Sequence, residues 1–349
     1  MADNSTKKKV CILSIDGGGI RGVLPGVIVA RLEEKLQIAT GNQDARIADY
    51  FDLIAGTSTG GILSCFYLMP DPEDPTRSKF NAQQAVDLYL KRGGDIFDVS
   101  FMQKLRSGAG LLDEKYSANA IESALGDNFG DTWLSELRKP CLVTSYDMQN
   151  RNAFFFRQQR ASNEINDFKV KDVARATSAA PTYFETSLVV NKIGSPYPLV
   201  DGGVFANNPT MCAYSEARSM NFEGKAEQPG AKDMMVVSIG TGSVRKPYAY
   251  ERAKDWGLIQ WIQPIIDVMM SGNSETVHYQ INQIFDTVKE GNTSSYYRLE
   301  PQLGTANSEM DDASDKNLQA LNAAGKAFVS LAENDRQLDD IVEILRANN

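Results

Sequence analysis

The chain repeats one local pattern, in which a short apolar run with β-branched residues leads into a glycine turn and then into a helical pattern. The first unit predicts a strand at Val10–Ile15 and a helix at Val23–Gln37. The second predicts a strand at Tyr50–Ala55 and a helix at Gly60–Met69. Strands that alternate with helices form βα units, whose strands run parallel. The sequence therefore predicts an α/β fold with a mainly parallel sheet.

The same periodicities extend along the rest of the chain. Further strands are expected at Pro140–Tyr146, at Ala153–Arg157, up to Val200, and at Met234–Ile239. Further helices are expected at Ala82–Arg92, Ala118–Phe129, Val170–Ser178 and Pro209–Met220. Beyond Gly242 the pattern is mostly helical, and one buried helical face is expected from Leu318, Leu321, Phe328 and Leu331.

Composition excludes several classes of function. The net charge of -9 argues against nucleic acid as a main partner and against electrostatic attraction to anionic lipid. No apolar run reaches the ~18 residues that span a bilayer, and MADNSTKKKV lacks the apolar part of a secretory signal, so we expect a cytoplasmic protein. Four cysteines without CxxC spacing predict buried free thiols and no metal site: Cys11, Cys65, Cys141 and Cys212.

The stretch Gly56-Thr57-Ser58-Thr59-Gly60 matches the GxSxG pattern. It lies between an apolar strand (YFDLIA) and an apolar helix (ILSCFYLM). In that context the serine occupies a tight strand-to-helix turn, and its hydroxyl projects from the end of the sheet. Ser58 is therefore the candidate nucleophile.

A serine nucleophile needs a base that accepts its proton. The single histidine, His278, lies in the polar helical stretch SETVHYQINQIF and is more typical of a surface or packing residue. Two aspartates are better placed because they adjoin turn glycines at strand ends: Asp16 in SIDGGG and Asp201 in PLVDGGVFANNP. The residues alone do not choose between them, and Asp-Gly is also a frequent backbone-capping turn.

The loop after the first strand fits the GxGxxG dinucleotide template through Gly17, Gly19 and Gly22. A dinucleotide-dependent oxidoreductase would also need an acidic residue at the end of the second strand. This chain has Gly56-Thr57-Ser58 there. The backbone N–H groups of this loop are therefore expected to bind an anion other than a dinucleotide pyrophosphate.

The motifs DGGGIRG, GTSTG and DGG, in that order, resemble the three signatures of the patatin-like phospholipase family, and SAAPTYF at Ser178–Phe184 resembles a further family segment. The resemblance runs from about Val10 to Gly242. It implies a lipid acyl hydrolase with a Ser-Asp dyad: Ser58 as nucleophile, Asp201 as base, and the backbone of Gly17, Gly18 and Gly19 as the oxyanion hole. It implies no cofactor.

The resemblance also implies a three-layer α/β/α fold with a helical C-terminal portion. We expect a flexible N-terminus at residues 1–9, a patatin-like catalytic domain at 10–300, and a helical extension at 301–349 packed on the same domain. The implied substrate is a phospholipid or another acyl lipid, with transient contact to a membrane surface.

Three further segments have structural and functional interpretations. Arg21 could orient the glycine loop, contact a phosphate or form a salt bridge. Asn207-Asn208-Pro209 is typical of a cap and first turn, and no chemistry is assigned to it. Apolar residues nearly encircle Trp256–Met270, which favours a buried helix over a lipid-facing one.

Two other functions share parts of these motifs. An acyltransferase of the malonyl-transferase type has the serine turn but normally needs a catalytic histidine. A catalytically idle storage or binding protein keeps the fold without needing Ser58, Asp201 and the glycine loop together.

Overall fold

The computed structural model describes residues 8–96, 114–243, 247–289 and 294–349. Within these ranges the central sheet has eight strands: β1 (Val10–Ile15), β2 (Leu53–Thr57), β3 (Cys141–Asp147), β4 (Asn152–Arg157), β5 (Ser187–Val190), β6 (Pro196–Asp201), β9 (Met234–Ile239) and β10 (Tyr296–Leu299). Their order is β10-β9-β1-β2-β3-β6-β5, with β4 also paired to β3. The strands from β10 to β3 are parallel, whereas β4, β5 and β6 pair antiparallel. The prediction of a mainly parallel sheet is confirmed.

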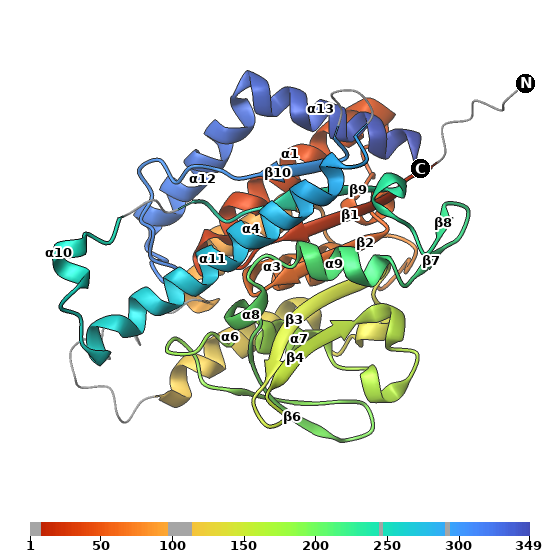
Figure 1. Cartoon of the computed structure of the whole chain (residues 1–349). Coiled ribbons are helices and arrows are strands. Elements are labelled where there is room, and N and C mark those ends of the chain that lie inside the picture. The colour runs from red at the N-terminus through yellow and green to blue at the C-terminus, as the bar shows by residue number, and fades with distance from the viewer. Residues whose placement is uncertain (1–7, 97–113, 244–246, 290–293) are drawn as a thin grey trace, which may run out of the picture.

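Helices cover both faces of this sheet (Figure 1). One face carries α1 (Val23–Thr40), α3 (Thr59–Leu68), α4 (Ala82–Ile96), α6 (Glu114–Phe129), α7 (Val170–Thr177), α12 (Asp315–Ser330) and α13 (Ala332–Ala347). The other face carries α9 (Thr210–Ala217) and α11 (Leu258–Asp286). Successive strand residues point to opposite faces. Accordingly Leu13 and Ile15 of β1 pack in the first core, and Ile12 packs in the second. The three-layer α/β/α architecture is confirmed.

Strand β3 pairs with one strand along its first edge and with two strands along its second. Antiparallel β4 pairs with Leu142–Asp147 along one edge. Strands β2 and β6 must then share the opposite edge, because β2 pairs with Cys141–Thr144 and β6 with Ser145–Asp147. The last residues of β2 and β6 pair with consecutive residues of β3: Thr57 lies opposite Thr144, and Asp201 lies opposite Ser145. This arrangement brings the carboxyl ends of two strands together.

The structure corrects several expected elements. Tyr50 belongs to the short helix α2 (Ile47–Tyr50), so the second strand begins at Leu53. Strands β5 and β10 were not predicted, because each is a four-residue edge strand with no helix directly behind it. Leu331 lies between α12 and α13 and is exposed, so it is not part of the buried helical face. The cysteines are free; three are buried and Cys212 is half-buried.

The first described residues lie beside the C-terminus (Figure 1). The Lys9 N–H donates to the Asn348 side chain, and Lys8 Nζ donates to the Asn349 carbonyl at 2.9 Å. Residues 1–7 of the expected flexible N-terminus lie outside the described residues. The helices α12 and α13 contribute Leu321 and Leu338 to the same core as α1.

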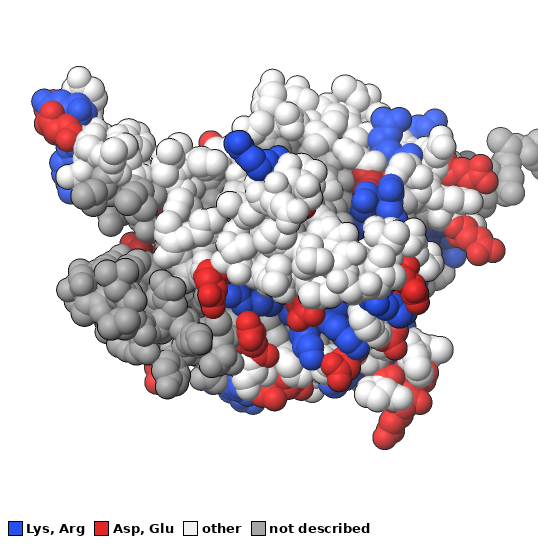
Figure 2. Space-filling model, turned by 90° about the horizontal axis from the view of Figure 1, so that it is seen from below, with Lys and Arg blue, Asp and Glu red and all other residues white. Residues whose placement is uncertain are grey.

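The expectation of a buried helix at Trp256–Met270 is wrong. Helix α11 begins at Leu258, and the apolar side chains on one side of its first half face solvent: Leu258, Trp261, Ile265, Val268 and Met269. Figure 1 shows this half extending beyond the sheet. In Figure 2 uncharged side chains predominate across the centre of the face seen from below, and charged ones form a band nearer its edge. Within the described ranges no helix is long and apolar enough to cross a membrane.

Gly60 supports a stability prediction. A Cβ there would lie 2.2 Å from the Ile15 carbonyl oxygen, so Gly60→Ala should lower the free energy of unfolding by about 1–3 kcal/mol. Gly126→Ala is the matched control. It adds the same methyl inside α6, where nothing lies within 4 Å, and should stabilise by about 0.5–1 kcal/mol. Urea unfolding measures both variants, and equal stabilities would contradict this packing account.

Candidate active site

Ser58 occupies a strained turn between β2 and α3. Its φ of 55° and ψ of -123° put a non-glycine residue in a region that costs conformational energy. The Ser58 N–H donates to Thr177 Oγ1 at 2.9 Å, and the Ser58 carbonyl accepts the first α3 bond from Ile62. The side chain is 5% exposed. These bonds fix the backbone that carries the hydroxyl.

The glycines that flank Ser58 are required by backbone contacts. A Cβ at Gly56 would lie 2.1 Å from the Gly60 carbonyl oxygen, and Gly60 itself lies against Ile15. Side chains at either position would push α3 away from β1 and β2. The GxSxG spacing therefore follows from how closely the turn packs on the sheet.

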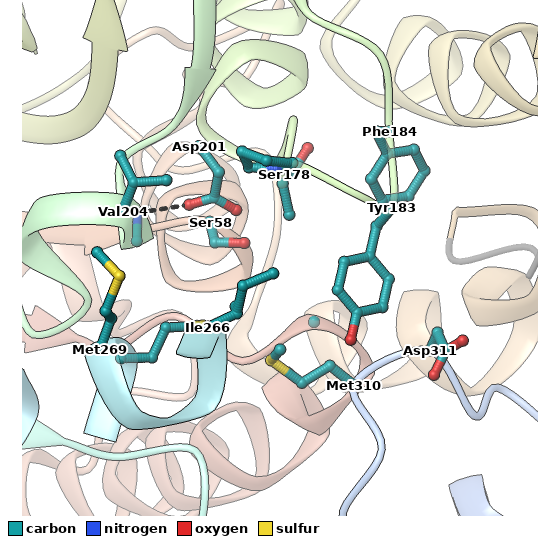
Figure 3. A pocket seen from close by; sticks show the side chains of 15 residues that line it. Ser58, Ser178, Tyr183, Phe184, Asp201, Val204, Ile266, Met269, Met310 and Asp311 are labelled. Carbon is teal, nitrogen blue, oxygen red and sulfur yellow. Dashed lines mark hydrogen bonds between the residues drawn. The ribbon is translucent and has the colours of Figure 1, made fainter. Parts of the chain in front are cut away.

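Asp201 ends β6 and faces Ser58 (Figure 3). Its Oδ1 accepts the Gly203 N–H at 2.7 Å, so the capping interaction expected of an Asp-Gly turn is present. Burial raises the pKa of Asp201 to about 7, and the Gly203 N–H and the nearby Ser58 side chain only partly oppose that rise. A carboxylate with this pKa is a stronger base than an exposed aspartate.

The glycine loop lies beside Ser58, since a Cβ at Gly17 would be 3.3 Å from the Ser58 Cβ. The Gly17 N–H donates to the Asn207 carbonyl at 2.9 Å and is therefore already occupied, contrary to its expected place in the oxyanion hole. The N–H groups of Gly18 and Gly19 have no acceptor among the described residues. Gly19 lines the cavity at Ser58, and its φ of +58° favours glycine.

Asp16 forms an ion pair with Arg298 at the start of the glycine loop. Its two carboxylate oxygens accept from Arg298 at 3.0 and 2.7 Å. Burial alone would lower the pKa of Arg298, but Asp16 and Glu300 outweigh it and raise that pKa, so the guanidinium stays charged. Arg298 lies on the unpredicted strand β10, and no motif in the sequence pointed to it.

Arg21 lies against backbone rather than a carboxylate. Its guanidinium donates at 3.4 Å to the carbonyls of Gly18 and Gly242. Among the residues the structure describes, it forms no ion pair within 4.0 Å. Of the three interpretations, orientation of the glycine loop fits these contacts.

His278 lies outside this cluster. It sits on α11 with Nδ1 2.9 Å from the Tyr296 hydroxyl, and it does not line the cavity. Burial lowers its pKa. A histidine-based triad or transferase site is therefore not assembled around Ser58.

Ser58 and Asp201 open into an apolar cavity of about 860 Å³, open mouth included. Its other walls come from Gly19, Ser178, Ala180, Pro181, Tyr183, Phe184, Gly203, Val204, Ile266, Met269, Met270, Met310 and Asp311. The segment SAAPTYF supplies one side of this wall, and its Ala179 carbonyl accepts the Asp201 N–H at 3.0 Å. Figure 3 shows methionine, isoleucine and aromatic side chains in the cavity wall beside Ser58 and Asp201, together with the polar Ser178 and Asp311. In the described ranges no cluster of three His, Cys, Asp or Glu side chains could hold a metal ion.

Sequence comparison gives consistent relatives. The sequence model of the family "Patatin-like phospholipase" matches residues 13–214. The chain is 33% identical to patatin-like protein 1 of Arabidopsis thaliana, over 92% of this chain and 81% of that protein. It is 30% identical to the probable inactive patatin-3-Kuras 1 of Solanum tuberosum, over 95% of this chain and 90% of that protein.

Structure comparison finds a more distant similarity. Human GIVD cytosolic phospholipase A2 aligns with a TM-score of 0.48 and 10% identity, over 97% of this chain and 60% of that chain. The family match covers more than half of the chain, and the similarity to full-length relatives extends over nearly all of it. The chain therefore belongs to the patatin-like phospholipase family.

Proposed function

We propose that this protein is a lipid acyl hydrolase of the phospholipase A or lysophospholipase type, acting through Ser58 and Asp201. One observation carries the proposal. A serine held in a strained turn faces a buried aspartate, and both line an apolar cavity. An acyl chain fits such a cavity, and the paired polar groups supply a nucleophile with its base.

The reaction has two steps. Asp201 accepts the proton of Ser58 while the Ser58 oxygen attacks the ester carbonyl, and the leaving alcohol then takes that proton. The developing oxyanion is stabilised by the N–H groups of Gly18 and Gly19, each typically worth ~2.7–4 kcal/mol in sites of this kind. Water then hydrolyses the acyl-enzyme and regenerates Ser58.

The exposed side of α11 supports contact with a lipid surface. Leu258, Trp261, Ile265 and Val268 follow one another at helical spacing along this side, and Leu258 is 92% exposed. Met269 continues the stripe and also lines the cavity, so the stripe reaches its mouth. A lipid could pass from a bilayer to Ser58 without crossing water. The net charge of -9 favours zwitterionic over anionic lipid.

Membership of the family does not by itself imply activity, since one relative is described as a probable inactive patatin. The proposal therefore rests on the site. A catalytically idle storage protein would not need Ser58 under backbone strain beside a buried carboxylate. Activity measurements on the dyad separate these alternatives.

A fluorophosphonate probe should label Ser58, and intact-protein mass spectrometry should show one adduct in the wild type and none in Ser58→Ala. Hydrolysis of phosphatidylcholine should fall by about 10³-fold or more in Ser58→Ala and in Asp201→Asn, because each removes a member of the dyad. His278→Ala is the matched control and should keep its activity. The dyad is wrong if Asp201→Asn hydrolyses normally while His278→Ala does not.

The pKa of Asp201 predicts two pH dependences. For a soluble ester, kcat/KM should rise with pH through about 7, since the ionised carboxylate is the base.

Asp201 holds its proton to higher pH in the folded protein than in the unfolded chain. Asp201 should therefore lower the free energy of unfolding as the pH rises from about 4 to about 7. Calorimetry should show Asp201→Asn gaining stability over the wild type across that window; a constant difference would contradict the raised pKa.

Charges on the α11 stripe should separate lipid docking from chemistry. Leu258→Glu and Val268→Glu should each weaken binding to phosphatidylcholine vesicles by about tenfold or more, with hydrolysis of a soluble ester retained. Leu188→Glu is the matched control, because Leu188 is 67% exposed on β5, away from the cavity lining. Co-sedimentation and ester hydrolysis measure the two effects. Equal vesicle binding by all three variants would exclude this docking surface.

A further inference from the structure

Asn207 carries a buried acceptor that the proposed reaction does not yet use. The residue is 6% exposed, and its Oδ1 has no hydrogen-bond donor among the described residues. Its Nδ2 donates to Ser274 Oγ at 3.1 Å and approaches the Gly17 carbonyl at 3.5 Å. A buried acceptor without a donor is costly, so Oδ1 requires a donor that the described residues do not supply.

The unpartnered oxygen lies next to the catalytic pair. A Cβ at Gly17 would be 2.5 Å from Asn207 Oδ1 and 3.3 Å from the Ser58 Cβ. A Cβ at Gly203 would be 3.4 Å from the same oxygen and 3.1 Å from Asp201 Oδ1. Two acceptor oxygens therefore flank the bare Cα face of Gly203, which lines the cavity.

We propose that the bare face of Gly203, Asp201 Oδ1 and Asn207 Oδ1 form the binding site of the hydrolytic water; this inference rests on the acyl-enzyme of the proposed function. Water has two protons, and it donates one to each oxygen. Its lone pair is left to face the acyl carbon on Ser58. Asn207 is thus a water-positioning residue, and glycine at position 203 leaves room for the water.

The step balances as follows. The water oxygen forms a bond to the acyl carbon as Asp201 Oδ1 takes one water proton. The tetrahedral intermediate then breaks its bond to Ser58 Oγ, which takes the proton from Asp201. The products are the free carboxylic acid and the regenerated serine. An alcohol has only one hydroxyl proton, and Asp201 takes it. No proton is left to donate to Asn207 Oδ1, so this contact favours water over an alcohol as the acceptor of the acyl group.

Competition between water and methanol tests this site. Wild-type protein and Asn207→Leu are incubated with p-nitrophenyl butyrate at a fixed methanol concentration, and methyl butyrate and butyric acid are quantified. Leucine keeps the volume of asparagine but removes the acceptor, so the ratio of methyl ester to acid should rise by roughly fivefold, the scale of one lost hydrogen bond. Both products arise from one acyl-enzyme, so slower acylation leaves the ratio unchanged.

Ser274→Ala is the matched control. It removes the partner of Asn207 Nδ2 but leaves Oδ1 in place, and its product ratio should equal that of the wild type. Asn207→Ala is a second variant, and its ratio should shift in the same direction as that of Asn207→Leu. An unchanged ratio in both Asn207 variants, or an equal rise in Ser274→Ala, overturns the water site. Absence of Ser58-dependent products from the wild type would instead refute the proposed function, and the water site with it.

Discussion

The site depends on two strands that share one edge of β3. Parallel β2 and antiparallel β6 pair with consecutive segments of that edge, so their carboxyl ends meet. Residues 58 and 201 are far apart in the chain, yet this pairing fixes them side by side through main-chain hydrogen bonds. A slip of one residue in either register would turn its side chain to the opposite face of the sheet. The relative position of Ser58 and Asp201 is therefore a property of the sheet rather than of flexible loops.

The apolar cavity has two effects on this pair. It offers a surface that an acyl chain can cover, and it removes water from Asp201, which raises the pKa of that carboxyl to about 7. The Gly203 N–H donates to this desolvated carboxylate and holds it in place. Asp16 is also buried, and burial raises its pKa to about 6, although its ion pair with Arg298 opposes that rise. Among the described residues, Asp16 therefore has a cationic partner that Asp201 lacks.

The sequence predicted local features well. Glycine turns after apolar runs predicted β1, β2 and the helices behind them, because these units are determined by neighbouring residues. Long-range pairing was not predictable in this way. Strand β10, and with it Arg298, lacked a turn signal, and the antiparallel pairing of β6 depends on which edge of β3 is vacant. Gly17 illustrates the same limit. Its position in the glycine loop fits an oxyanion donor, but the Asn207 carbonyl accepts its N–H. The exposed side of α11 was missed because periodicity shows where apolar residues lie, not whether a partner covers them.

The central claim is that Asp201 is the desolvated base of Ser58. The most direct measurement is a titration of the side-chain carboxyl carbons by NMR, in protein labelled with ¹³C-aspartate, comparing the wild type with Asp201→Asn. The account predicts one resonance that titrates near pH 7 in the wild type and is missing from the variant. A resonance of Asp201 that titrates near its ordinary value of 3.8 would contradict it.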